Sequence, residues 1–164
     1  MPLLNGVCTL TLAWQVFPDA PVVAAANRDE ALDRPSEPPS VIETDPTVVA
    51  PRDAEAGGTW IGYNGHGLFV AITNRWTGES VAGDRSRGLL VRDALRQPSA
   101  EDATRLVERE LDERTYEGFN LVLADANAAL LIEWDGTSRR VTNFDPGVHV
   151  VVNVGADGRY AIPA

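Results

Sequence analysis

The sequence predicts an α+β fold built from antiparallel sheets. Segments rich in Val, Thr and aromatic residues alternate with turn residues at both ends of the chain, as strands joined by hairpins do. Between them, apolar residues recur at helical spacing. With 164 residues, 44% of them hydrophobic, the chain is long enough for one domain with a substantial core.

The first two strands are expected to form a hairpin. Residues 8–16, CTLTLAWQV, alternate as a half-buried strand does, and the Pro-rich segment 18–21 then turns the chain. The apolar run 21–26 returns as the partner strand. It brings the polar cluster 27–30, NRDE, back beside Cys8 at the start of the first strand.

The next segments predict a loop followed by three strands. Residues 31–46 hold four prolines and few apolar side chains, which indicates a surface loop. Strand signals follow at 47–50 and 58–63. The Gly-rich turn 64–67 then leads into a strand over 68–74.

Two amphipathic helices are predicted in the middle of the chain and strands after them. The apolar stripes are Leu89, Leu90, Ala94, Leu95 and then Ala103, Leu106, Val107, Leu111, the second preceded by the capping residue Ser99. Strand signals resume at 119–125, 128–134, 138–143 and 147–154, and a turn is expected at 155–158 before the segment RYAIP. Residues 8–164 are expected to form a single domain. Because the two predicted helices would cover only one face of a sheet and leave its other face uncovered, we expect a C-terminal part of this domain to be missing.

The charge balance argues against a nucleic-acid partner. The chain has 24 acidic residues against 14 basic ones, all arginine, and a net charge of -10. Nucleic-acid binders normally present a clustered basic face. An acidic surface without lysine suits either a halophilic source or an arginine-rich, GC-biased genome.

No segment indicates a membrane span or a secretory signal. No apolar stretch approaches the roughly 20 residues that a membrane helix needs. The start, MPLLNGV, lacks the basic and apolar regions of a signal peptide. The expected location is therefore cytoplasmic, with no membrane partner.

Cys8 is the only cysteine, so an internal disulfide and a cysteine-based zinc site are excluded. A lone cysteine among apolar residues is most often a small buried hydrophobe. As a nucleophile it would need a base, because the thiolate is the reactive form. His66 and His149 are candidates, but both lie at Gly turns where surface imidazoles are common. If Cys8 were the first residue of the mature chain, its own α-amine could be the base.

The NRDE cluster offers the other groups that such a nucleophile needs. Asp29 could hold the α-amine, Arg28 could favour the thiolate, and the Asn27 amide could donate to an oxyanion. The alternative is a solvated turn in which Arg28, Asp29 and Glu30 form local ion pairs. Both interpretations stay open at this stage.

Several motifs in order resemble one family. The near-terminal C-T-x, then A-A-N-R-D-E, G-G-T-W-I-G, A-I-T-N, S-R-G-L-L-V-R-D and Y-E-G-F-N-L-V-L-A-D are similar to the NRDE family, also called transport and Golgi organisation protein 2. That family resembles the N-terminal nucleophile (Ntn) hydrolases, which implies an αββα sandwich of antiparallel sheets. Its members are longer than this chain and typically begin Met-Cys.

A fainter resemblance reaches the choloylglycine and penicillin V acylase group of cysteine amidases. It implies oxyanion roles for Asn74 and Asn153 and an amine-holding role for Asp29. The arginine of that group three residues before the aspartate is replaced by Ala26, which leaves Arg28 as a substitute from another position. The distal arginine of the group would fall beyond the last residue.

The same asparagines and tryptophans also have structural interpretations. Asn74 and Asn153 could simply end strands at turns. Trp60 is expected in the core, whereas Trp76 and Glu30 are candidate ligand contacts. Gly57 and Gly58 are expected to serve a turn.

Two functions follow from the resemblance. The first is an N-terminal cysteine hydrolase acting on an amide or thioester of a small, partly apolar substrate, with no cofactor or metal. The second is a non-catalytic carrier of an apolar ligand, either haem or an acyl-lipid. Residues 1–7 would then be a leader or a mis-assigned extension, removed by cleavage before Cys8 or absent if translation starts at position 7. The oligomeric state is not indicated.

Overall fold

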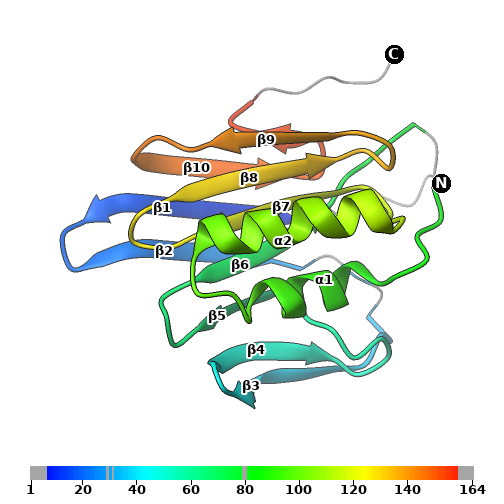
Figure 1. Cartoon of the computed structure of the whole chain (residues 1–164), viewed down its shortest axis with the longest axis horizontal. Coiled ribbons are helices and arrows are strands. Elements are labelled where there is room, and N and C mark those ends of the chain that lie inside the picture. Colours follow the sequence, from blue (N-terminus) through cyan, green and yellow to red (C-terminus); the bar gives the residue numbers. More distant parts are fainter. Residues whose placement is uncertain (1–6, 29, 31, 79–80, 159–164) are drawn as a thin grey trace.

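The computed structural model describes residues 7–28, 30, 32–78 and 81–158, and they form three stacked layers. Two helices lie side by side on one face of a seven-stranded antiparallel sheet, and a four-stranded antiparallel sheet packs on the other face (Figure 1). The predicted α+β class and the sheet-on-sheet sandwich are confirmed. Of the four layers that the resemblance implies, the described residues supply three.

The elements follow the expected order of strands, two helices and strands. They are β1 Thr9–Phe17, β2 Ala20–Asn27, β3 Ser36–Thr44, β4 Thr47–Asp53, β5 Ile61–Asn64, β6 Phe69–Asn74, α1 Arg87–Ala94, α2 Ala100–Glu113, β7 Phe119–Ala124, β8 Ala129–Trp134, β9 Arg139–Asn143, β10 Gly147–Val152 and β11 Gly155–Ala156.

The four-stranded sheet has the order β11-β10-β1-β2, and the predicted hairpin β1–β2 lies at its edge. Thr9 pairs with Asn27 on one side and with Val152 on the other, so Cys8 and the NRDE cluster are neighbours as predicted. The alternation of β1 directs Leu10, Leu12 and Trp14 into the space between the sheets.

The seven-stranded sheet has the order β3-β4-β5-β6-β7-β8-β9, and its central strands carry both cores. All six residues of β7 are buried, because the helices cover one face and the second sheet covers the other. Leu121 and Leu123 pack towards the helices, while Val122 packs between the sheets. Burial on both faces explains why the sequence of β7 is a nearly continuous apolar run and does not alternate between apolar and polar residues.

The loop predicted over 31–46 is wrong, because Ser36–Thr44 forms the edge strand β3. The loop was predicted because prolines such as Pro38 and Pro39 are uncommon within strands. They fall where the register with β4 shifts, between Glu37 and Ser40, and only one side of an edge strand needs backbone donors.

The strand predicted over 58–63 begins only at Ile61, because the preceding residues meet helix α1. A Cβ built on Gly58 would lie 2.3 Å from the carbonyl carbon of Gly88, and one on Gly88 would lie 3.2 Å from the Thr59 nitrogen. The Thr59 nitrogen donates to the Gly88 carbonyl oxygen at 3.1 Å. Two glycines from separate motifs therefore let the start of α1 rest directly on the β4–β5 loop.

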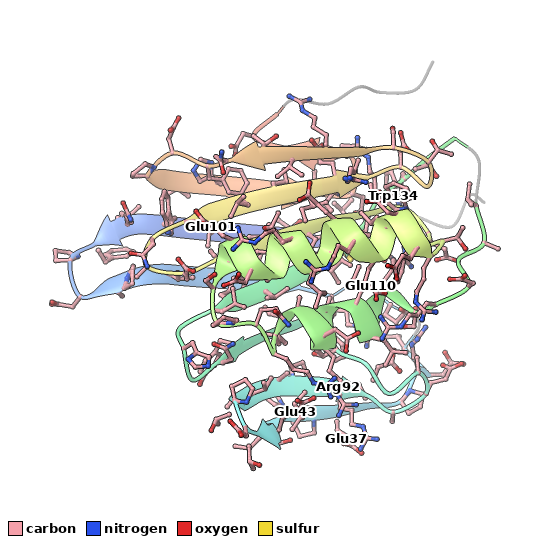
Figure 2. All side chains as sticks on the ribbon, in the orientation of Figure 1. Glu37, Glu43, Arg92, Glu101, Glu110 and Trp134 are labelled. Atoms are coloured by element: carbon pink, nitrogen blue, oxygen red, sulfur yellow. The ribbon has the colours of Figure 1, made fainter. Side chains whose placement is uncertain are left out.

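Local capping and ion pairs fix the helices. Ser86 caps α1 and Ser99 caps α2, where its hydroxyl accepts from the Asp102 nitrogen at 3.1 Å. On the other side of α1, Arg92 reaches Glu43 of β3 at 2.8 Å, and Figure 2 shows these two side chains pointing towards each other. The helix layer is thus tied to the edge of the sheet.

The predicted turn at 155–158 contains the short strand β11, which pairs with β10. The leader predicted over 1–7 lies outside the described residues except for Val7, and the segment RYAIP also lies outside them. Among the described residues, no helix has the length and apolar character needed to cross a membrane.

Candidate functional site

A cavity of about 120 Å³ opens between the two sheets, where the ends of β1 and β2 face β5, β6 and the start of α1. It is lined by Cys8, Thr9, Leu10, Ala26, Asn27, Arg28, Glu30, Arg34, Asp53, Thr59, Trp60, Ile61, Ala71, Ile72, Thr73, Asn74, Ser86, Arg87 and Gly88. Five of the motifs named above contribute residues to this lining: C-T-x, A-A-N-R-D-E, G-G-T-W-I-G, A-I-T-N and S-R-G.

Cys8 lies immediately before β1, and its side chain is 8% exposed. Asn27 fixes the backbone on both sides of it. The Asn27 Nδ2 donates to the Val7 carbonyl at 2.9 Å, and the Thr9 nitrogen donates to the Asn27 Oδ1 at 3.0 Å. Asn27 therefore positions the cysteine through the peptide groups that flank it.

The guanidinium of Arg28 lies over the Trp60 ring, with its carbon 4.0 Å from the ring centroid. Among the described residues, the carboxylate oxygens that pair with it are those of Glu30 at 3.6 Å and Asp53 at 3.8 Å. The core position predicted for Trp60 is wrong, because the ring lines the cavity under this arginine. Asp29 lies outside the described residues.

Asp53 and Arg34 form a short ion pair in the cavity wall. The Asp53 Oδ2 accepts from the Arg34 Nη2 at 2.6 Å and Nε at 3.0 Å, while Oδ1 accepts from the Glu55 and Ala56 nitrogens. Burial raises the pKa of this carboxyl, but the Arg34 and backbone hydrogen bonds outweigh it, so the net pKa is lowered.

Replacing this carboxylate should destabilise the protein in a pH-dependent way. Because the folded-state pKa of Asp53 is lowered, its contribution is present above the unfolded pKa of about 3.9 and disappears as the pH falls through the folded value. We expect Asp53→Asn to cost about 1–3 kcal/mol at pH 7 and progressively less below about pH 4. Urea unfolding across this range measures the difference.

The matched control is Asp19→Asn, in the exposed turn between β1 and β2, which should leave stability nearly unchanged. An Asp53→Asn penalty that is the same at pH 3 and pH 7 would contradict the assignment of a charged, hydrogen-bonded Asp53.

Arg87 enters the cavity from the first residue of α1. It donates to the Gly118 carbonyl at 2.8 Å and pairs with Glu117 at 2.9 Å. Burial lowers the pKa of its guanidinium. The charges of Glu117, Glu30 and Cys8 raise that pKa, whereas Arg34 lowers it further. Arg87 and Cys8 line the same cavity.

The predicted oxyanion asparagines have different positions. Asn74 ends β6 and lines the cavity with Cys8, and no hydrogen bond to a described residue engages its side-chain amide. Asn153 is buried behind it, outside the cavity lining, and its Nδ2 donates to the Asn74 carbonyl at 2.9 Å. Asn153 Oδ1 is buried without a hydrogen-bond partner within the described part of the chain.

Trp76 and the two histidines do not line the cavity. Trp76 is 47% exposed, and its backbone nitrogen donates to the Asn153 carbonyl. His66 lies in the β5–β6 turn. His149 contacts Asp157 at 2.7 Å and stacks on Phe144, so neither imidazole is positioned as a base for Cys8.

Sequence reasoning missed Arg34, Asp53 and Arg87 as members of the site. The signal for Arg87 was present, because it lies in the S-R-G motif, and the G-G-T-W motif contributes the wall beside it. Arg34 and Asp53 carried no signal of their own. They reach the cavity only because the unpredicted strand β3 brings the preceding segment alongside β4.

Comparison with known proteins identifies related sequences. Residues 7–161 match the family described as Transport and Golgi organisation 2. The chain is 32% identical to the transport and Golgi organization protein 2 homolog of Homo sapiens over 111 residues and 31% identical to that of Mus musculus. These alignments cover 66% of this chain and 40% of each relative, so the matched part spans less than half of the relatives' length.

Comparison with solved structures gives two partial matches. Penicillin V acylase from Agrobacterium tumefaciens has a TM-score of 0.46 and 13% identity, over 85% of this chain and 42% of the acylase. A variant of the conjugated bile acid hydrolase from Clostridium perfringens has a TM-score of 0.46 and 10% identity, over 88% of this chain and 45% of the hydrolase.

Proposed function

Because the chain belongs to the Transport and Golgi organisation 2 family, whose name specifies no chemistry, the site itself must suggest one, and we propose an N-terminal cysteine hydrolase. The bond cleaved is an amide or a thioester of a small substrate. The observation that carries the proposal is the position of Cys8, the only thiol of the chain, in a cavity wall shared with Asn74 and arginine side chains.

The mechanism assigns one role to each group. The Cys8 thiolate attacks the substrate carbonyl, the amine or thiol leaves, and a thioester joins the acyl group to Cys8 until water hydrolyses it. The base that takes the thiol proton is the α-amine of Cys8, which exists only when Cys8 is the first residue. The Asn74 amide donates to the oxyanion that forms on the carbonyl oxygen.

The surrounding residues prepare the nucleophile. Asn27 holds the backbone at Thr9, which fixes the start of β1 relative to the cavity. Arg87 lines the same cavity as Cys8 and contributes a positive charge to its wall. Asn153 has a positioning role, because its Nδ2 holds the backbone of Asn74.

The alternative function, a carrier of haem or an acyl-lipid, has less support. Sites that enclose drug-sized ligands are typically about 300–1,000 Å³ and mostly apolar. The cavity here measures about 120 Å³, and arginine and carboxylate side chains line much of it. A small acyl group beside Cys8 fits these dimensions better than a macrocycle does.

The test is hydrolysis by a protein that begins at Cys8, using thioesters and amides of short acyl groups. We expect Cys8→Ala to reduce kcat/KM by at least about 10³-fold, because it removes the nucleophile. Thr11→Ala, on the outer side of the same strand, is the matched control and should retain activity. Full activity in Cys8→Ala would refute the proposal.

A further inference from the structure

The candidate site gathers positive charge within an acidic protein. Among the described residues, three guanidinium groups line the cavity, those of Arg28, Arg34 and Arg87, together with two carboxylates, Glu30 and Asp53. The whole chain has a net charge of -10. Among the described lining residues the balance of charge is therefore positive, opposite in sign to that of the whole chain, and a positive potential attracts anions.

The three arginines differ in how far their hydrogen-bond donors are already used. Arg34 donates two hydrogen bonds to Asp53, from Nε and Nη2. The other Asp53 oxygen accepts from the Glu55 and Ala56 nitrogens. Arg87 donates to Gly118 and pairs with Glu117. These two side chains are structural anchors whose charge still acts on the cavity.

Arg28 is different, because no described residue accepts a hydrogen bond from it. Its carboxylate neighbours are 3.6 and 3.8 Å away, beyond the usual 2.7–3.2 Å of such a bond. The guanidinium carbon lies over the Trp60 ring at 4.0 Å from its centroid, and the Arg28 side chain is 21% exposed. Arg28 is thus partly buried, and within the described part of the chain its N–H donors are not used in hydrogen bonds.

We propose that the substrate carries an anionic group, either a carboxylate or a phosphate, which binds to Arg28 while its acyl carbonyl lies at Cys8. The proposal rests on the hydrolase function above for the identity of the ligand as a substrate. A planar guanidinium held against an aromatic ring suits such a group, since it can donate two parallel hydrogen bonds to two oxygens. Arg34 and Arg87 add to the attraction without direct contact.

The first experiment measures anion binding without any turnover. Iodoacetamide, a neutral reagent, alkylates Cys8 as the only thiol, and intact mass follows the reaction. Succinate or inorganic phosphate should slow alkylation in the whole chain relative to sodium chloride of equal ionic strength. Arg28→Gln should weaken the protection about 10- to 100-fold in half-effective concentration, the usual effect of losing a charge-assisted hydrogen bond.

Two further variants make the result specific. Arg105→Gln, on the exposed side of α2 and paired with Asp102, removes the same charge and should leave the protection unchanged. Arg28→Lys keeps the charge without the planar fork and should give an intermediate effect, with a Tm that shows whether the protein is folded. The anion that protects at the lower concentration identifies the group. Equal protection of the native protein and Arg28→Gln, or none in either, would overturn the proposal.

The second experiment compares succinyl and butyryl thioesters of one thiol, using protein that begins at Cys8. We expect kcat/KM to favour the succinyl compound about 10- to 100-fold and Arg28→Gln to abolish the preference. Hydrolysis without preference and without protection would refute the anion subsite and leave the hydrolase intact. Protection without hydrolysis of either thioester would refute the hydrolase and leave the anion subsite intact.

Discussion

A protein whose first residue is Cys8 should hydrolyse its substrate about 10²- to 10⁴-fold faster than the same protein carrying Val7. This is the usual contribution of a positioned general base. With Val7 present, the Cys8 nitrogen belongs to a peptide bond and cannot accept the thiol proton. No imidazole replaces it, since neither His66 nor His149 lines the cavity. Rates on a short-chain thioester, with intact mass to verify the first residue, measure the effect.

A matched control is the Cys8-first protein extended by one glycine, which removes the amine with the least change in bulk. It should be as slow as the protein that carries Val7. Acetylation of the Cys8 amine should have the same effect on the active protein. If all these forms were equally fast, the α-amine could not be the base.

Gly58→Ala should be the most damaging single methyl addition in the site wall. The added Cβ would lie 2.3 Å from the Gly88 carbonyl carbon and 2.6 Å from its oxygen, so backbone must move. We expect a loss of about 3 kcal/mol, at the upper end of the range for overpacked sites, and a fall in Tm of roughly 10 °C. Thermal unfolding of the purified variant measures this loss.

The same substitution should also reduce activity, because Gly88 follows Arg87 and the displaced helix carries that arginine away from Cys8. Gly78→Ala is the matched control, since a Cβ at Gly78 would have no heavy atom within 4 Å. A Gly58→Ala protein as stable and active as Gly78→Ala would show that the β4–β5 loop and α1 are not in contact in solution.

The sequence predicted the parts of the fold that depend on local patterns. The hairpin β1–β2 was predicted and is confirmed. The helix cap at Ser99 was also predicted and is confirmed, whereas the cap at Ser86 was not predicted. The neighbourhood of Cys8 and Asn27 followed from the hairpin alone, and the structure confirms it. The family predicted from the motifs is also confirmed.

The remaining features depend on tertiary contacts that no local pattern reports. Strand β3 contains two prolines and is tolerated only because it lies at a sheet edge. Trp60 is a large apolar residue of the kind expected in a core, yet Arg28, which directly follows strand β2, lies over its ring. The catalytic roles of Cys8 and Asn74 stay predictions, as do the roles assigned to Asp29 and Asn153.

The two hydrogen bonds by which the Asn27 amide holds the backbone before and after Cys8 have a consequence for maturation. In a chain that begins at Cys8, the Asn27 Nδ2 loses the Val7 carbonyl that it now binds. The same event creates an α-amine with a pKa of about 7.7–8, which is largely an ammonium at neutral pH. Processing would therefore change the cavity electrostatically as well as chemically, adding a positive charge and a released N–H donor at once. Activation of the nucleophile and attraction of an anionic ligand would then be two outcomes of a single cut.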